Sequence, residues 1–237
     1  MTDGASFPTD VAALFREALT RHAESRLAEA ENLYRQVLER DPHHAQALGL
    51  LAMLLTDGPD EAAAEAILLR HLALRPHDGA SLHGLGQLRA RQGDDEAAVA
   101  LFQRAAQWLP QLAPISNDLG VSLHRLERSE AALAALDRAI GVEPAYAAAH
   151  GNRGVVLFDL GRFDEAFDAQ LASLLNADVR ATEIRASALE NLWRAARKAG
   201  RRQEAGALAS VQVQVGELDA LLADRLAQIL DGSDRPG

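Results

Sequence analysis

Residues 98–110 read AVALFQRAAQWLP, and residues 132–144 read ALAALDRAIGVEP. Each segment opens with alanine, carries a larger apolar residue four places later and ends at a proline twelve places later. Residues 30–42, AENLYRQVLERDP, follow the same pattern. The prolines Pro42, Pro76, Pro110 and Pro144 are therefore spaced by 34 residues each time. A fixed period of this length indicates a protein built from stacked copies of one small unit.

Each unit is expected to be a pair of helices. An apolar stripe with helical spacing precedes a short polar turn, and the quoted segment follows it as a second helix. The proline then stops the second helix, because it lacks an N–H donor and disfavours a helical residue before it. Gly86, Gly120 and Gly154 fall within the first helices at one phase of the repeat. A glycine there costs about 1 kcal/mol relative to alanine, so its recurrence predicts close helix–helix contact.

The composition agrees with an all-α protein. Of 237 residues, 48 are alanine and 38 are leucine, both strong helix formers, whereas only 10 are aromatic. There is no cysteine, which excludes disulfides, thiolate metal sites and cysteine nucleophiles. The net charge of −10 argues against general nucleic-acid binding. The high arginine content, against the single lysine Lys198, suggests a bacterial source.

The repeated unit resembles the tetratricopeptide repeat, in which a large residue, Leu-Gly, an alanine, an aromatic and a proline recur. The first large position is never tryptophan here, and the aromatic position holds Leu68, Leu136 and Gln170 in three units. The resemblance implies an all-α fold, a right-handed α-solenoid of stacked helix-turn-helix units with a C-terminal capping helix. The expected repeats span residues 11–44, 45–78, 79–112, 113–146 and 147–180, followed by an irregular sixth over 181–215.

The ends of the chain lie outside the regular pattern. Residues 1–10 are expected to be a flexible N-terminus, and the repeat domain covers residues 11–215. An apolar series with alternating three- and four-residue spacing favours a helix over residues 202–230, as one piece or as two divided at Gly216. Residues 216–231 are interpreted as a capping helix, with a dimerisation surface as the alternative, and residues 232–237 as a tail.

The resemblance also implies where a partner binds. In the family, residues of the first helices line the concave side of the solenoid, and the same repeat places can be read from this sequence. The predicted groove residues are Met53, His83, Gln87, Arg91, Asn117, Val121, His124, Arg125, Asn152, Val155 and Phe158. The middle of this set is polar and partly basic, which suits an acidic or carboxylate-bearing peptide. The alternative is that Arg91 and Arg125 simply end their helices, where a cation is favourable.

No catalytic constellation is visible. Phosphate-binding glycine loops, nucleophile elbows and zinc motifs are all missing from the sequence, so no enzymatic activity, cofactor or metal is expected. The carboxylates of Asp60, Asp94 and Asp164 and their neighbours open second helices, where they favour the helix dipole. Residues 1–10 lack the apolar core of a signal peptide and no stretch is long enough to span a membrane, so we expect a cytoplasmic protein without membrane insertion.

The sequence thus predicts a non-catalytic interaction module or adaptor that binds a protein or peptide segment in the concave groove, and not nucleic acid. Two alternatives remain. The chain could be an accessory subunit that presents substrate to a modifying enzyme, since similar bacterial repeats occur fused to sulfotransferase, glycosyltransferase or oxygenase domains. It could also be a self-assembling scaffold, a homodimer formed through the C-terminal helix. The fold alone does not choose between these functions.

Overall fold

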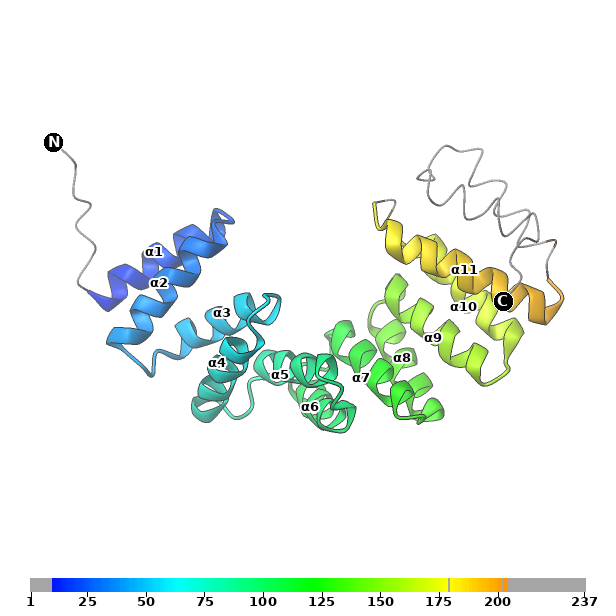
Figure 1. The fold of residues 1–237 in the computed structure, drawn as a ribbon, viewed down its shortest axis with the longest axis horizontal. Coiled ribbons are helices and arrows are strands. Elements are labelled where there is room, and N and C mark those ends of the chain that lie inside the picture. The colour runs from blue at the N-terminus through cyan, green and yellow to red at the C-terminus, as the bar shows by residue number, and fades with distance from the viewer. Residues whose placement is uncertain (1–9, 179, 202, 204–237) are drawn as a thin grey trace. The chain divides into compact units, whose positions relative to one another are not determined.

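The computed structural model describes residues 10–178, 180–201 and 203. This part of the chain consists of α-helices joined by short turns and contains no β-strand. Its helices, in chain order, are α1 (Val11–Ala23), α2 (Leu27–Arg40), α3 (Ala45–Thr56), α4 (Glu61–Leu74), α5 (Gly79–Arg91), α6 (Asp95–Trp108), α7 (Ala113–Arg125), α8 (Ser129–Val142), α9 (Ala147–Asp159), α10 (Phe163–Asn176) and α11 (Thr182–Ala199) (Figure 1).

The 34-residue period of the sequence is the period of the helices. First helices begin at residues 11, 45, 79, 113 and 147, and second helices begin at residues 27, 61, 95, 129 and 163. Four of the second helices end two residues before the recurring proline, as expected from its missing N–H. The predicted all-α fold of stacked helix pairs is therefore confirmed.

Caps and turns fix where the second helices start. The carboxylates of Asp60 and Asp94 accept hydrogen bonds from backbone N–H groups three residues ahead, at 3.0 and 3.1 Å, which caps α4 and α6. The turn before a second helix uses left-handed backbone, with Gly93 at φ +80° and Gly161 at φ +75°. At the matching position of the fourth pair stands Glu127, with φ +60°, where a side chain is unfavourable.

The glycines within the first helices allow the two helices of a pair to interlock. A Cβ atom on Gly86 would lie 2.6 Å from Cε1 of Phe102, and one on Gly120 would lie 2.6 Å from Cγ of Leu136. These distances are far below van der Waals contact, so the large side chain of the second helix occupies the space of the missing methyl. The predicted close helix–helix contact at these glycines is confirmed.

In the fifth pair the interlocking side chain is polar. Gln170 is 1% exposed, and it packs against Gly154 where the preceding pairs have an aromatic or a leucine. Its Nε2 donates to the carbonyl of Gly151 at 2.9 Å, while its buried Oε1 has no hydrogen-bond partner. Ser173 adds a second hydrogen bond from α10 to α9, to the carbonyl of Ala147 at 2.9 Å. Hydrogen bonds therefore hold α9 and α10 together alongside the apolar contacts.

The chain forms two compact units, residues 1–110 and residues 111–237. In the first unit, α1 to α6 bury a core of leucines and alanines that includes Leu14, Tyr34, Leu48 and Leu68. In this unit His71 of α4 is 4% exposed and lies 2.7 Å from Oγ of Ser81 on α5. Burial lowers the pKa of His71, with the nearby Asp78 carboxylate opposing and Arg75 reinforcing the shift.

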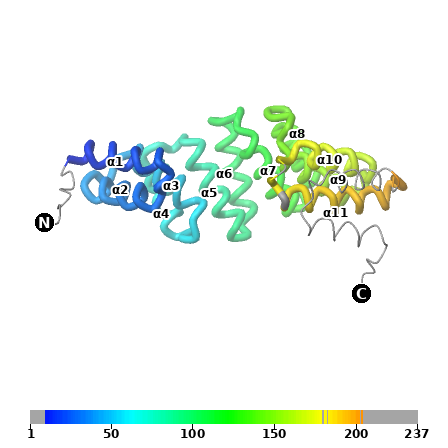
Figure 2. The backbone as a smooth tube through the Cα atoms, turned by 90° about the horizontal axis from the view of Figure 1, so that it is seen from above, coloured from blue at the N-terminus to red at the C-terminus, as the bar shows by residue number. Residues whose placement is uncertain are grey.

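In the second unit, α7 and α8 form one helix pair and α9 and α10 the next, with α11 packed on both α9 and α10 (Figures 1 and 2). Helix α11 has 18 residues, five more than α9, which agrees with the longer first helix that the turn spacing predicts. It ends at Ala199, and the next residue, Gly200, adopts left-handed backbone with φ +79°. The predicted helix over residues 202–230, the capping helix over 216–231 and both chain ends lie outside the described residues.

Candidate functional site

First helices of neighbouring pairs contact one another directly, as α3 and α5 do in the first unit. In the second unit α7 contacts α9, and α9 contacts α11. We call the surface that these three helices share the α7–α9–α11 face. The Nδ2 atom of Asn152 on α9 donates to Oδ1 of Asn117 on α7 at 2.9 Å, and Nε2 of His124 lies 3.1 Å from a carboxylate oxygen of Asp159. Predicted groove residues of successive repeats are thus brought side by side.

The predicted residues of α7 and α9 differ in how far they reach solvent. Asn117 is buried, with 6% of its surface exposed. Val121, His124, Asn152 and Val155 are half-buried, and Phe158 is half-buried at the C-terminal end of α9. Arg125 is exposed at the end of α7. The accessible part of this face therefore combines valine side chains with polar groups.

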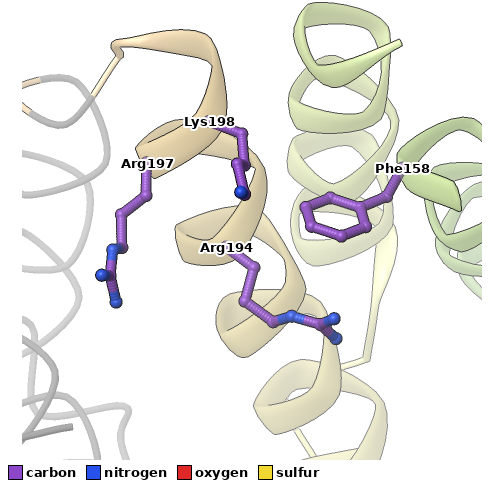
Figure 3. Close-up of a pocket in the computed structure, with 4 residues that line it drawn as sticks. All are labelled: Phe158, Arg194, Arg197 and Lys198. Carbon is purple, nitrogen blue, oxygen red and sulfur yellow. The ribbon is translucent and has the colours of Figure 1, made fainter. Parts of the chain in front are cut away.

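A pocket of about 480 Å³ lies where α9 meets α11. Among the described residues, Phe158, Arg194, Arg197 and Lys198 line it (Figure 3). The guanidinium carbon of Arg194 lies 4.8 Å from the centre of the Phe158 ring, a cation–π contact. Figure 3 shows Arg194 and Lys198 projecting toward the ring, whereas Arg197 projects to the other side of α11. The pocket therefore joins one aromatic ring to a cluster of positive charge.

These cations form no ion pair within the described part of the chain. No carboxylate in residues 10–178, 180–201 and 203 forms an ion pair with Arg194, Arg197 or Lys198. All three side chains are exposed. The guanidinium of Arg194 donates a hydrogen bond to Oδ1 of Asn191 at 3.4 Å. A positive cluster on a chain of net charge −10 is available to an anionic ligand.

The sequence pattern identified Phe158 but not its cationic neighbours. They lie on α11, after the regular 34-residue period has ended. The glycine that recurs in the turns gives the register of this irregular repeat. When Gly200 is aligned with Gly161, Arg194 falls at the position of Val155 and Arg197 at the position of Phe158. This alignment would have placed both arginines at predicted groove positions.

In the first unit, the predicted residues lie on α3 and α5, which contact each other. Met53 of α3 is an exposed apolar side chain, with 52% of its surface accessible. His83 and Gln87 of α5 are half-buried, and the His83 ring lies 5.6 Å from the ring of Phe102. Met53 is therefore the most accessible apolar side chain among the predicted residues of this unit.

Arg91, which the sequence offered as a cation for a partner, bonds within its own unit. Its Nε lies 2.9 Å from Oε1 of Glu61 on α4, and its NH2 group donates to the carbonyl of Thr56 at 2.9 Å. Thr56 is the last residue of α3, so the guanidinium satisfies a carbonyl that the helix itself leaves without a donor. A charge reversal at Arg91 would disturb α3 as well as any binding, and it is a poor test of partner recognition.

A tyrosine at the start of α9 has a perturbed pKa. Burial raises the pKa of Tyr146, and the carboxylates of Asp118 and Glu143 raise it further. The phenol is therefore neutral at physiological pH and acts as a hydrogen-bonding group rather than as an anion.

Two classes of site are not found in the described residues. No group of three or more histidine, aspartate or glutamate side chains is arranged to hold a metal ion in that part of the chain. Among the helices described, none is long and apolar enough to cross a membrane.

Comparison with known proteins gives the family. Two tetratricopeptide repeat models match the chain, one over residues 21–91 and the other over residues 117–183, which together make up more than half of it. No curated protein matches the sequence significantly.

Several solved structures share the fold. PilW, described as a widely conserved type IV pilus biogenesis factor, superposes with a TM-score of 0.73 at 16% identity over 92% of this chain and 99% of its own. PilF of Pseudomonas aeruginosa superposes with a TM-score of 0.70 at 16% identity over 92% and 97%. YrrB, described as a TPR protein with an unusual peptide-binding site, gives 0.61 at 20% identity over 82% and 97%. At these identities the likeness concerns the fold, and together with the two family matches it shows that this chain belongs to the tetratricopeptide repeat family.

Proposed function

We propose that this chain is a non-catalytic adaptor that binds a segment of a partner protein on the faces of its first helices. Stacked helix pairs present extended surfaces for binding, and the two family matches support this class of function. Residues that face solvent on these helices include apolar side chains, such as Met53 and Val155, that contribute little to the buried core. Apolar surface next to polar groups is typical of an interaction site.

The observation that carries the proposal is the contact between first helices of successive pairs. The Asn117–Asn152 hydrogen bond and the Arg194–Phe158 contact link α7 to α9 and α9 to α11. The side chains of three helices thereby form one surface, which can engage an extended or helical segment over several residues at once. A segment of that kind is bound by many modest contacts along its length rather than at one point.

The test is affinity capture from a lysate of the native host with the purified chain. A double variant, Val121→Arg with Val155→Arg, places two bulky charges on the α7–α9–α11 face. The control is Ala131→Arg with Ala134→Arg, which adds the same charge at exposed positions of the second helix α8. Circular dichroism before capture establishes that both variants retain the helical content of the wild type.

We expect the face variant to lose at least one partner that the wild type and the α8 control both retain. Two arginines within a half-buried surface displace an apolar contact and add desolvation costs, which weakens such contacts at least tenfold. Recovery of the same partners by all three proteins would contradict the proposal and would move the binding surface away from these helices.

A further inference from the structure

The pocket between α9 and α11 points to the chemistry of the partner segment. We propose that this pocket binds glutamate or aspartate side chains of an acidic peptide segment, with the carboxylates on Arg194 and Lys198 and the aliphatic stem over the Phe158 ring. The inference rests on the proposed function, because it assumes that the α7–α9–α11 face binds a polypeptide. It names the chemical class of that polypeptide, which the face alone does not.

The charge of the pocket is the first step of the argument. Arg194, Arg197 and Lys198 bring three positive charges to one turn of α11, and none of them is paired with a carboxylate of the described residues. Elsewhere the exposed arginines are commonly paired within their own helix or with the next, as with Arg162 and Glu165 at 2.6 Å. A cluster left unpaired on an acidic chain attracts carboxylates by complementarity.

The Phe158 ring indicates which kind of acidic ligand the pocket can bind. Its ring makes an edge contact with the Phe163 ring at 5.2 Å and faces the Arg194 guanidinium at 4.8 Å, so its position is fixed by both neighbours. The ring faces two cations of α11 (Figure 3), so it offers apolar contact to the methylene groups of a glutamate while the carboxylate reaches the charges. A volume of about 480 Å³ is of the size that accommodates a few side chains.

A polypeptide fits these features better than a nucleic acid does. Nucleic-acid binding relies on many phosphate contacts along a positive track, roughly six to ten in well-studied cases. Here the pocket contributes three cationic side chains on a chain of net charge −10. Repulsion along the rest of a nucleic-acid backbone would offset the few contacts in the pocket, whereas a short acidic segment can be flanked by neutral residues.

The experiment measures fluorescence anisotropy with a labelled peptide of six glutamates, with a peptide of six glutamines as the uncharged reference. The test variant is Arg194→Gln with Lys198→Gln in the full chain. The matched control, Arg16→Gln with Arg138→Gln, removes the same charge from exposed positions that do not line the pocket. All three proteins are checked by circular dichroism.

We expect hexaglutamate to bind the wild type and the control alike and to bind the test variant about tenfold more weakly, since each exposed charge pair contributes roughly a two- to fivefold factor. Binding should weaken as sodium chloride rises, because salt screens exposed charges. Hexaglutamine should not bind measurably. Equal binding of hexaglutamate to the test variant and the control would overturn the inference.

The single lysine gives a direct reading of the site. Lys198 is the one lysine side chain of the chain, so amine acetylation followed by mass spectrometry reports on the pocket without any substitution. Saturating hexaglutamate should slow acetylation of Lys198 several-fold relative to the α-amino group, whereas hexaglutamine should not. Unchanged acetylation under conditions where hexaglutamate binds would place the peptide elsewhere and would refute the assignment.

Two further outcomes separate the possible errors. Tighter binding of oligo(dT) than of hexaglutamate, lost in the same variant, would assign the pocket to nucleic acid and overturn the inference. If hexaglutamate fails to bind while Val121→Arg with Val155→Arg still abolishes partner capture, then the acidic chemistry is wrong and the proposed function stands. If hexaglutamate binds at the pocket but Val121→Arg with Val155→Arg captures the same partners as the wild type, then the proposed function is wrong instead.

Discussion

Replacing Gly120 by alanine should destabilise the second unit, although alanine is the better helix former. The new Cβ would lie 2.6 Å from Cγ of Leu136 and 3.2 Å from the backbone carbonyl oxygen of Ala132, so either α8 moves or Leu136 leaves its position. Overpacking of this kind costs about 1–3 kcal/mol, whereas the gain in helix propensity is about 1 kcal/mol. We therefore expect a net loss of roughly 1 kcal/mol.

Gly141 provides the matched control in the same unit. It lies in α8, it is exposed, and a Cβ atom there would meet nothing within 4 Å. Gly141→Ala should therefore increase the stability by about 0.5–1 kcal/mol, because only the propensity term remains. The same substitution at two helical glycines of one unit should thus shift the free energy of unfolding in opposite directions.

Urea denaturation measures both changes. Trp108 belongs to the first unit and Trp193 to the second, and they are the two tryptophans of the chain. In a Trp108→Phe background the fluorescence of Trp193 reports on the second unit, and the slope of the transition shows whether the unfolded surface is unchanged. In a further Leu136→Ala background, which removes the clashing atom, Gly120→Ala should cost much less.

The reasoning would be refuted if Gly120→Ala raised the denaturation midpoint as much as Gly141→Ala does. The space at Gly120 would then be adaptable, and the recurrence of glycine at this phase of the repeat would need another cause. A cost for Gly120→Ala that remained unchanged in the Leu136→Ala background would also refute it, because Leu136 would not be the side chain responsible.

Three further changes test particular side chains. Gln170→Leu should stabilise the second unit by about 1 kcal/mol in urea denaturation, since it buries apolar surface and removes an unsatisfied oxygen; a loss would contradict this. Glu127→Gly should raise the stability by roughly 0.5–1 kcal/mol by relieving left-handed strain, and an unchanged denaturation midpoint would argue against strain there. Because the pKa of His71 is lowered in the folded chain, the unfolded chain binds a proton at His71 more readily than the folded chain does. The stability that neutral His71 contributes is therefore fully present above pH 6.5 and is lost as the pH falls below that value. In a Trp193→Phe background, the melting temperature followed at Trp108 should fall more steeply between about pH 7.5 and 5.5 with His71 present than after His71→Gln. An equal dependence of the melting temperature on pH in both proteins would exclude this role.

The helix pairs could be predicted from the sequence because their signals are local and repeat. Pro42 and its successors stop helices, and Gly86 and Gly120 mark close contacts, whatever surrounds them. The contacts of Arg91 could not be predicted in this way, because its partners Glu61 and Thr56 come from another helix pair. The spacing of residues along one helix predicts which side chains share a face. It does not predict which residues of other helices contact them.

Only part of the candidate pocket could be predicted from the sequence, for a similar reason. Phe158 occupies a regular repeat position, so the period predicts its face. Arg194 and Lys198 follow a longer helix, and there the 34-residue period gives no register. Their proximity to Phe158 depends on how α11 packs across α9, which is a property of tertiary structure.

The interlock between glycine and a large side chain has a consequence for how such a chain can grow. Gly86 with Phe102, and Gly120 with Leu136, each lie within a single 34-residue repeat. Duplication of one repeat in a gene therefore copies the glycine and its large partner together. The two helices of the new repeat then fit each other sterically from the start. The contact between repeats at Asn117 and Asn152 joins the fifth place of one repeat to the sixth place of the next, and the equivalent places of the other repeat hold Gly151 and Asp118 instead. Exact copies would carry the same residue at equivalent places, so the side chains of the α7–α9–α11 face reflect point substitutions made after the repeats were multiplied.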